Sequence, residues 1–135
     1  MFHIKYLLAI ETSGNICSVA LYKGSECIAI KESHKVNTHS ESLALFIRTI
    51  FENINISLNK LDEIAVSSGP GSYTGLRIGT SMAKGLVYGL DIPLISVSTL
   101  EAMAIAMKKG SEQNTDFNPN SLPSYTYVSS PNFIS

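Results

Sequence analysis

The sequence predicts an α/β domain over residues 1–110, with helices packed on a five-stranded mixed sheet. Apolar runs at the start of the chain are separated only by short turns, which is typical of consecutive strands. Two later segments repeat apolar residues with the period of a helix, and a third opens with a helix-capping pattern. Short apolar runs stand between these segments, so the second part of the domain is predicted to be βαβα.

Three strands are expected first, at residues 4–10, 16–22 and 27–32. The first is almost continuously apolar, which is the pattern of a strand covered on both faces. Polar turns at residues 13–15 and 23–26 join it to the other two, so the three strands should form an antiparallel meander.

Both cysteines fall on neighbouring strands of this meander. The predicted register places Cys27 opposite about Tyr22, and Cys17 opposite about Glu32. The two sulfurs are then about 16 Å apart along the ladder, at about 3.3 Å per residue. A disulfide requires Cα atoms within about 7 Å, so we expect two buried thiols.

The first helix is predicted to follow Thr38 and to end near Ile54. Thr38 and Glu41 fit a capping box, in which each side chain satisfies a backbone N–H of the first turn. The helix carries an apolar stripe wider than packing on a single surface requires. The members of the stripe are Leu43, Phe46, Ile47, Ile50, Phe51 and Ile54. Leu45 falls outside the stripe beside Arg48, so this helix should contact more than its own sheet.

Strands and helices alternate in the rest of the domain. Strands are expected at residues 63–68 and 93–97, and helices at residues 73–90 and from Ser98 to about Lys109. Helical crossovers imply that the later strands pair in parallel. An antiparallel meander followed by parallel βα units is the layout of ribonuclease-H-like and actin-like ATPase domains.

Small residues recur at every fourth position of the helix at residues 73–90, at Gly75, Gly79 and Ala83. Such a stripe lets another backbone approach closely, and this packing should offset the cost of glycine in a helix, which is about 1 kcal/mol per residue. The opposite face carries Arg77 and Tyr88, residue types that are common at protein interfaces.

Composition favours a globular protein of the cytoplasm. Hydrophobic residues make up 44% of the chain and the net charge is −1, whereas a free-standing nucleic-acid binder would usually be basic. The sequence has neither an apolar run as long as a membrane span nor the pattern of a secretory signal. Residues 111–135 are rich in Ser, Asn and Pro, and we expect a polar linker or disordered tail with a brief strand at residues 125–128.

A glycine-rich turn between a strand and a helix is the main candidate site. Residues 69–75 read Gly-Pro-Gly-Ser-Tyr-Thr-Gly, and such a turn can aim backbone N–H groups at an anion. It lacks the Lys of a Walker A loop and the spacing of a dinucleotide fingerprint, so a structural turn is favoured over nucleotide contact. A second polar turn follows the first strand. The candidate phosphate-loop residues are Glu11, Thr12, Ser13, Gly69, Gly71, Ser72 and Thr74.

Neither a catalytic residue nor a metal site is expected. His34 and His39 are five residues apart, whereas two ligands on one helical face need a spacing of four. His39 is expected to help cap the helix instead. Ser67, Ser68 and Ser72 lack a Gly-x-Ser-x-Gly elbow, so their expected role is hydrogen bonding within the loop.

The segment Gly-Pro-Gly-Ser-Tyr-Thr-Gly-Leu-Arg-Ile-Gly at residues 69–79 closely resembles the signature of the TsaB (YeaZ) family. The resemblance extends over about residues 4–109 and includes Leu-Ala-Ile-Glu-Thr-Ser near the start. It implies the actin, Hsp70 and sugar-kinase fold, also called glycoprotease-like, with two like domains of which this chain holds the first. Active ATPases of that fold have an Asp and glycines after the first strand, so Glu11 resembles part of a degenerate phosphate loop.

The resemblance also implies a function. Proteins of this family are non-catalytic scaffold or activating subunits that pair with a TsaD-type catalytic subunit and work with a TsaE-type ATPase. Together they add a threonylcarbamoyl group to the adenosine beside the tRNA anticodon. We therefore expect tRNA contact only through the complex, a homodimer when the chain is alone, and no firmly bound cofactor, with the partner interface as the place for ATP or ADP. The expected interface residues are Leu45, Arg48, Gly75, Arg77, Gly79, Lys84 and Tyr88.

Two other functions remain open at this point. One is an ATP-dependent small-molecule kinase of the same fold, which needs an acid and glycines in the turn at residues 11–13. The other is a chaperone or glycoprotease-like interaction protein, which would bind or cleave peptides without affecting tRNA.

Overall fold

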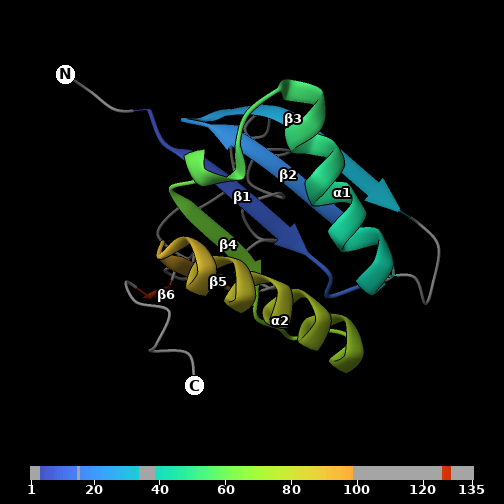
Figure 1. The fold of residues 1–135 in the computed structure, drawn as a ribbon. Coiled ribbons are helices and arrows are strands. Elements are labelled where there is room, and N and C mark those ends of the chain that lie inside the picture. Colours follow the sequence, from blue (N-terminus) through green and yellow to red (C-terminus); the bar gives the residue numbers. More distant parts are fainter. Residues whose placement is uncertain (1–3, 15, 34–38, 99–125, 129–135) are drawn as a thin grey trace, which may run out of the picture.

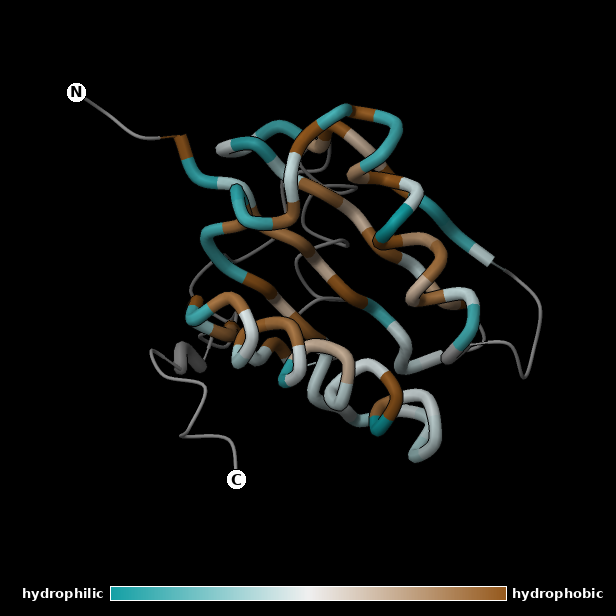
Figure 2. Tube along the Cα trace, in the orientation of Figure 1, coloured by the Kyte–Doolittle hydropathy of each residue, from teal (hydrophilic) through white to brown (hydrophobic). Residues whose placement is uncertain are grey.

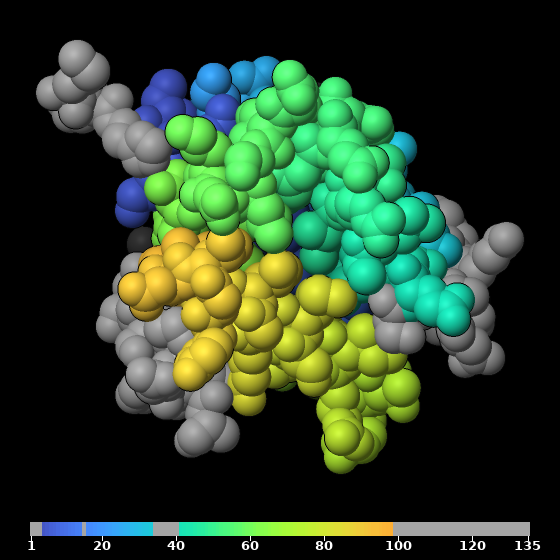
Figure 3. Space-filling model, in the orientation of Figure 1, coloured from blue at the N-terminus to red at the C-terminus, as the bar shows by residue number. Residues whose placement is uncertain are grey.

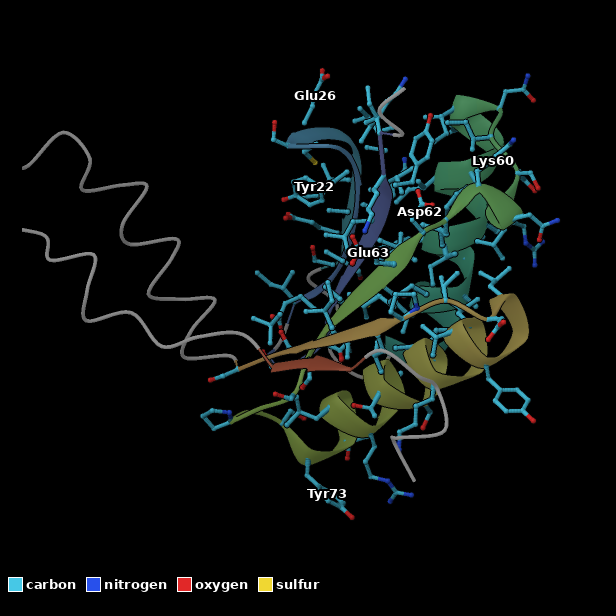
Figure 4. The ribbon with its side chains drawn as sticks, turned by 90° about the vertical axis from the view of Figure 1, so that its left-hand side faces the viewer. Tyr22, Glu26, Lys60, Asp62, Glu63 and Tyr73 are labelled. Atoms are coloured by element: carbon cyan, nitrogen blue, oxygen red, sulfur yellow. The ribbon has the colours of Figure 1, made fainter. Side chains whose placement is uncertain are left out.

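The computed structural model describes residues 4–14, 16–33, 39–98 and 126–128. Its strands form one mixed sheet in the order β3-β2-β1-β4-β5-β6, and both helices described, α1 and α2, lie on the same face of it (Figures 1 and 4). The strands are β1 Tyr6–Glu11, β2 Cys17–Lys23, β3 Glu26–Ser33, β4 Glu63–Ser67, β5 Leu94–Val97 and β6 Thr126–Val128. The helices are α1 His39–Ile54, the 3-10 turn η1 Leu58–Lys60 and α2 Tyr73–Leu90.

Strand pairing follows the predicted layout. β1 pairs antiparallel with β2, and β2 pairs antiparallel with β3, which makes the expected meander. β4 is parallel to β1, and β5 is parallel to β4. All five expected strands are present, each within two residues of its predicted bounds. The brief strand expected near residue 126 is β6, which pairs antiparallel with β5 and becomes the sixth strand of the sheet.

The core lies between this sheet and the two helices. Leu8 and Ile10 of β1 point to the helices and are buried, as the period of two in a strand requires. The stripe of α1 packs against them, whereas Leu45 is 54% exposed, as expected from its place outside the stripe. Figure 2 shows hydrophobic segments along the central strands and at intervals along both helices. The buried residues of the stripe are Leu43, Ile47, Ile50 and Phe51.

The cysteines agree only partly with the prediction. Cys27 pairs with Tyr22 as expected, whereas an irregularity between Leu21 and Tyr22 places Cys17 opposite Ser33. Neither cysteine is in a disulfide. Cys17 is buried and burial raises the pKa of its thiol. Cys27 is exposed, so the expectation of two buried thiols is wrong for it, because β3 is the edge strand of the sheet.

Several predictions fall outside the described residues. They include the capping role of Thr38 and of the His39 side chain, the helix ending near Lys109, and the character of most of residues 111–135. The division of the chain at residue 110 therefore stays a prediction. In the described part of the chain, no helix is both long enough and apolar enough to cross a bilayer.

Candidate functional site

The two polar turns predicted as a phosphate loop meet at one edge of the sheet. Glu11 ends β1 and Ser67 ends β4, and these parallel neighbours present their carboxyl ends on the same side. The chain continues from β4 through residues 69–71 into α2, which begins at Tyr73. The two turns lie at one edge because crossover connections in α/β units place the loops of neighbouring parallel strands on the same side of the sheet.

The carboxylate of Glu11 is held by donors from the turn after β1 and from the end of β4. Its Oε1 accepts a hydrogen bond from the backbone N–H of Ser13 at 2.8 Å and another from the Ser13 hydroxyl. Its Oε2 accepts from the hydroxyl of Ser67. Ser13 and Ser67 are both buried. We call Glu11, Ser13 and Ser67 the Glu11 network, in which each carboxylate oxygen has at least one donor.

The residues beside this network join the first turn of α2. The Ser13 carbonyl accepts from the backbone N–H of Ser72 at 2.7 Å, and the Thr12 hydroxyl donates to the Gly75 carbonyl at 2.6 Å. Thr12 is fully buried. Ser72 is the N-cap of α2, and its side chain accepts from the Gly75 N–H at 3.2 Å. β1, β4 and α2 are thus connected by hydrogen bonds within the chain.

Two glycines at this junction lie so close to Ser13 and Thr12 that a side chain would not fit. A Cβ at Gly71 would lie 2.5 Å from the Ser13 carbonyl oxygen, and a Cβ at Gly79 would meet the Thr12 hydroxyl oxygen. Gly69 has a φ of +113°, which side chains disfavour. Gly75 and Gly79 are buried on the sheet side of α2. Their predicted place on a partner-facing surface is therefore wrong, because the side chain of Thr12, in the turn after β1, contacts both of them.

The chemistry of the junction differs from that of a phosphate-binding turn. A phosphate-binding turn leaves backbone N–H groups pointing at its ligand. Here the Ser13 N–H and hydroxyl donate to Glu11, and the Ser72 N–H donates to Ser13. The negative charge of Glu11 would also repel a phosphate. Thr74 does not take part in the hydrogen bonds described here and lies exposed on the first turn of α2.

The outer faces of the helices carry the other predicted site residues. Leu45 and Arg48 are exposed on α1, and Arg77 and Tyr88 are exposed on α2, while Lys84 is half-buried. Figure 4 shows Tyr73 at the start of α2, pointing away from the sheet. The guanidinium of Arg77 lies 5.5 Å from the centre of the Tyr73 ring, which is a distance typical of cation–π contacts.

Two grooves run along these helices. The α1–α2 groove has a volume of about 730 Å³ and is lined mainly by apolar side chains of both helices, including Phe51, Met82 and Leu86. The α2 groove, about 620 Å³, follows the outer face of α2 past Thr74, Arg77 and Gly85. In the space-filling view the two helices lie next to each other, with the surface hollowed between them (Figure 3).

The sequence predicts that the glycines of residues 75–89 suit partner packing, but it does not separate Gly85 and Gly89 from Gly75 and Gly79. A Cβ at either position would meet nothing within 4 Å, so both face open space on the outer side of α2. With Ser81 they repeat every fourth residue, as Gly75, Gly79 and Ala83 do on the buried side. Only Arg77, four residues before Ser81 and too polar for the core, distinguishes the outer stripe in the sequence.

The described residues contain no group of three or more His, Cys, Asp or Glu side chains that could hold a metal ion. His34 and the His39 side chain lie outside those residues, so the structure does not test the prediction that they form no metal site.

Comparison with known proteins identifies the family. A family model described as TsaD, tRNA N6-adenosine threonylcarbamoyltransferase, matches residues 32–124. The Haemophilus influenzae protein named tRNA threonylcarbamoyladenosine biosynthesis protein TsaB is 43% identical over 100 residues, which are 74% of this chain and 42% of that protein. The chain belongs to the TsaB (YeaZ) family. It spans less than half of the length of this TsaB relative.

This TsaB-family chain is also similar to a transferase in sequence and to a solved structure in fold. The tRNA N6-adenosine threonylcarbamoyltransferase of Wolbachia pipientis is 33% identical over 120 residues, which cover 78% of this chain and 36% of the enzyme. A Pseudomonas aeruginosa crystal structure described as similar to peptidase YeaZ is 30% identical, with a TM-score of 0.72, and the match covers 82% of this chain and 50% of that one. TsaB-type and transferase-type proteins therefore share this domain.

Proposed function

We propose that this chain is a non-catalytic subunit that docks onto a related catalytic subunit and supports threonylcarbamoylation of tRNA. The names of its relatives supply the pathway: one is a tRNA threonylcarbamoyladenosine biosynthesis protein and another is a tRNA threonylcarbamoyltransferase. The outer surface of α1 and α2 suggests how the chain acts, which is by docking onto another protein. The observation that carries the proposal is the outer face of these two helices, which exposes large apolar side chains and has small residues that would let another helix pack closely.

Large apolar side chains stay exposed on this face. Leu45 is 54% exposed, Tyr73 is 74% exposed and Tyr88 is 72% exposed. Tyrosine and arginine are enriched at the centres of protein interfaces, and here Arg77 already stacks on Tyr73. Exposed apolar residues next to two apolar grooves favour an interface over a purely solvated surface.

The outer face of α2 fits one kind of occupant, a helix of the partner. Gly85 and Gly89 leave open space where side chains would otherwise keep a second helix away. Helices pack with axes about 8–10 Å apart, and small residues at the contact permit the shorter end of that range. Gly85 also lines the α2 groove, so a partner side chain can enter beside it.

A partner with a similar domain is favoured over an unrelated one. Transferase-type relatives share this domain, so they carry a counterpart of the same two helices. Pairing between like domains is pseudo-symmetric, with the same surface used on both sides, as in two-fold dimers. A TsaD-type catalytic subunit is thus the proposed partner, and a homodimer through the same face is the state proposed for the chain alone.

The junction at the end of β1 supports the non-catalytic part of the proposal. Its donors are engaged by Glu11 and by the turn itself, which disfavours the phosphate contacts that an ATP-dependent kinase of this fold needs. ATP turnover by the complete protein alone, lost on changing Glu11, would instead establish the kinase.

The docking experiment compares two substitutions of the same charge. Gly85→Arg places a long charged side chain in open space, so the fold is kept while the outer face of α2 is blocked. Ser25→Arg adds the same charge at an exposed position of the β2–β3 hairpin, away from both helices. We expect calorimetry with the TsaD-type subunit of the same organism to show a loss of affinity of about tenfold or more for Gly85→Arg only. Equal affinities for the two variants would overturn the docking proposal.

The pathway is tested separately in cells. Depleting the full-length gene product should lower threonylcarbamoyladenosine in total tRNA, measured by mass spectrometry of the digested nucleosides. Re-expressing the Ser25→Arg protein should restore the modification, and re-expressing the Gly85→Arg protein should not. An unchanged level of the modified nucleoside after depletion would remove this function from the chain.

A further inference from the structure

The carboxylate of Glu11, at the end of β1, is the main hydrogen-bond acceptor for the turn that follows. Every polar group of Ser13 is engaged: its N–H and hydroxyl donate to Glu11, and its carbonyl accepts from the Ser72 N–H at 2.7 Å. Ser13 is also buried, so water does not readily replace these partners. The orientation of Ser13 therefore depends on the Glu11 carboxylate.

The orientation of Ser13 in turn sets where α2 begins. Ser72 is the N-cap residue of α2, and Thr12, the neighbour of Ser13, donates to the Gly75 carbonyl in the first turn of the helix. The carboxylate also reaches β4 through the Ser67 hydroxyl. One acidic side chain thus connects two parallel strands to the start of the helix that follows them.

We propose that Glu11 is a positioning residue whose carboxylate serves as a fixed internal anion. It engages the donors that converge where β1 and β4 end, and through Ser13 it holds the first turn of α2 in place. The inference does not depend on the proposed docking, because it concerns the chain alone.

The number and type of donors favour an anion over a neutral acceptor at this point. A backbone N–H and two hydroxyl groups converge on the two carboxylate oxygens. An amide in the same place has one acceptor oxygen, and its NH₂ group would face either the Ser13 N–H or the Ser67 hydroxyl. Hydrogen bonds to a charged acceptor are about twice as strong as neutral ones, so a neutral replacement weakens the whole junction.

Hydrogen exchange of the full-length protein tests the inference directly. Glu11→Ala should speed amide exchange at residues 72–79 by about tenfold. Without the hydrogen bonds to the charged carboxylate, the first turn of α2 should open more often. Glu63→Ala is the matched control. It removes a carboxylate from the opposite end of the β1–β4 pair, where Glu63 forms an ion pair with Lys5 at 3.7 Å (Figure 4). Exchange at residues 72–79 should be unchanged in this control.

Chemical rescue separates an anion role from a packing role. Formate fits the space that Glu11→Ala vacates and brings the missing carboxylate, so it should restore slow exchange at residues 72–79 in this variant. Chloride at the same ionic strength should not. Restoration by both salts, or by neither, would overturn the role of Glu11 as an internal anion.

A second variant keeps the test valid if Glu11→Ala does not fold. Glu11→Gln retains the shape of the side chain and removes only its charge, so it should also speed exchange in the first turn of α2. Wild-type exchange rates in a folded Glu11→Gln protein would overturn the proposal. None of these readouts involves a partner, so a failure of docking and a failure of this inference are distinguishable.

Discussion

At the scale of single residues, Gly79 and Gly85 lie in the same helix and have opposite surroundings. Gly79 is buried against Thr12, whose hydroxyl is fixed by its bond to the Gly75 carbonyl and cannot move aside without breaking it. Gly85 faces open space. The same substitution should therefore have opposite effects at the two positions.

We expect Gly79→Ala to destabilise the fold by about 1–2 kcal/mol, because overpacking outweighs the gain in helix propensity. Gly85→Ala should stabilise it by up to about 1 kcal/mol, because only the propensity changes. Urea unfolding followed by circular dichroism measures both. The assignment of faces on α2 would be wrong if Gly79→Ala were the more stable of the two variants.

The two cysteines should also differ in reactivity, because one is buried and the other is exposed. Cys17 is buried and its thiol has a raised pKa, so little thiolate is available to a reagent in the folded protein. Cys27 is exposed on the edge strand β3. A water-soluble disulfide reagent at neutral pH should modify one thiol rapidly, and the second only in denaturant. Cys27→Ser should abolish the rapid phase, and a rapid phase that persists in this variant would contradict the placement of Cys17.

At the scale of elements, α2 shows what the sequence could and could not predict. Its bounds were predictable, since Ser72 is a good N-cap and the apolar period ends at Leu90. Which of its two small-residue stripes meets the sheet was indicated only by Arg77, which is too polar for the core, because both stripes repeat every fourth residue. The deciding contact is with Thr12, more than 60 residues earlier in the chain, and no local pattern reports it.

The junction at the end of β1 illustrates the same limit. The sequence placed Glu11 and the turn at residues 69–71 in one candidate phosphate loop. It did not indicate that Ser67 would turn towards Glu11, since a serine at a strand end has many possible partners. The exposure of Cys27 was missed because its strand lies at the edge of the sheet, which is a property of the whole topology.

The C-terminal end of α2 gives a prediction at this scale. Asp91 adopts a left-handed conformation with φ of 54°, and its N–H bonds to the Val87 carbonyl. A side chain is disfavoured there, and its negative charge opposes the helix dipole. We expect Asp91→Gly to stabilise the fold by about 1 kcal/mol in thermal unfolding. Asp91→Asn removes only the charge and should give a smaller gain. A loss of stability in both variants would contradict this account of the cap.

At the scale of the whole molecule, hydrogen bonds at the junction join the sheet to the helix that follows it. The meander supplies β1, the crossover through α1 places β4 beside it, and Glu11 ties both strands to α2 through Ser67 and Ser13. The inner face of α2 packs against its own sheet, and its outer face is the surface proposed to bind a partner. The division of α2 into two faces is what connects this fold to the proposed function.

A nucleotide should therefore leave the stability of the isolated chain unchanged. A ligand present at 100 times its dissociation constant stabilises a protein by about 2.7 kcal/mol, which would raise the melting temperature by several degrees for a domain of this size. Because the donors around Glu11 are engaged within the chain, we expect millimolar Mg-ATP to give no such rise in differential scanning fluorimetry. MgCl₂ at matched ionic strength is the control for salt. A rise that saturates with ATP concentration would show that the junction opens to phosphate, and it would favour the kinase over the scaffold.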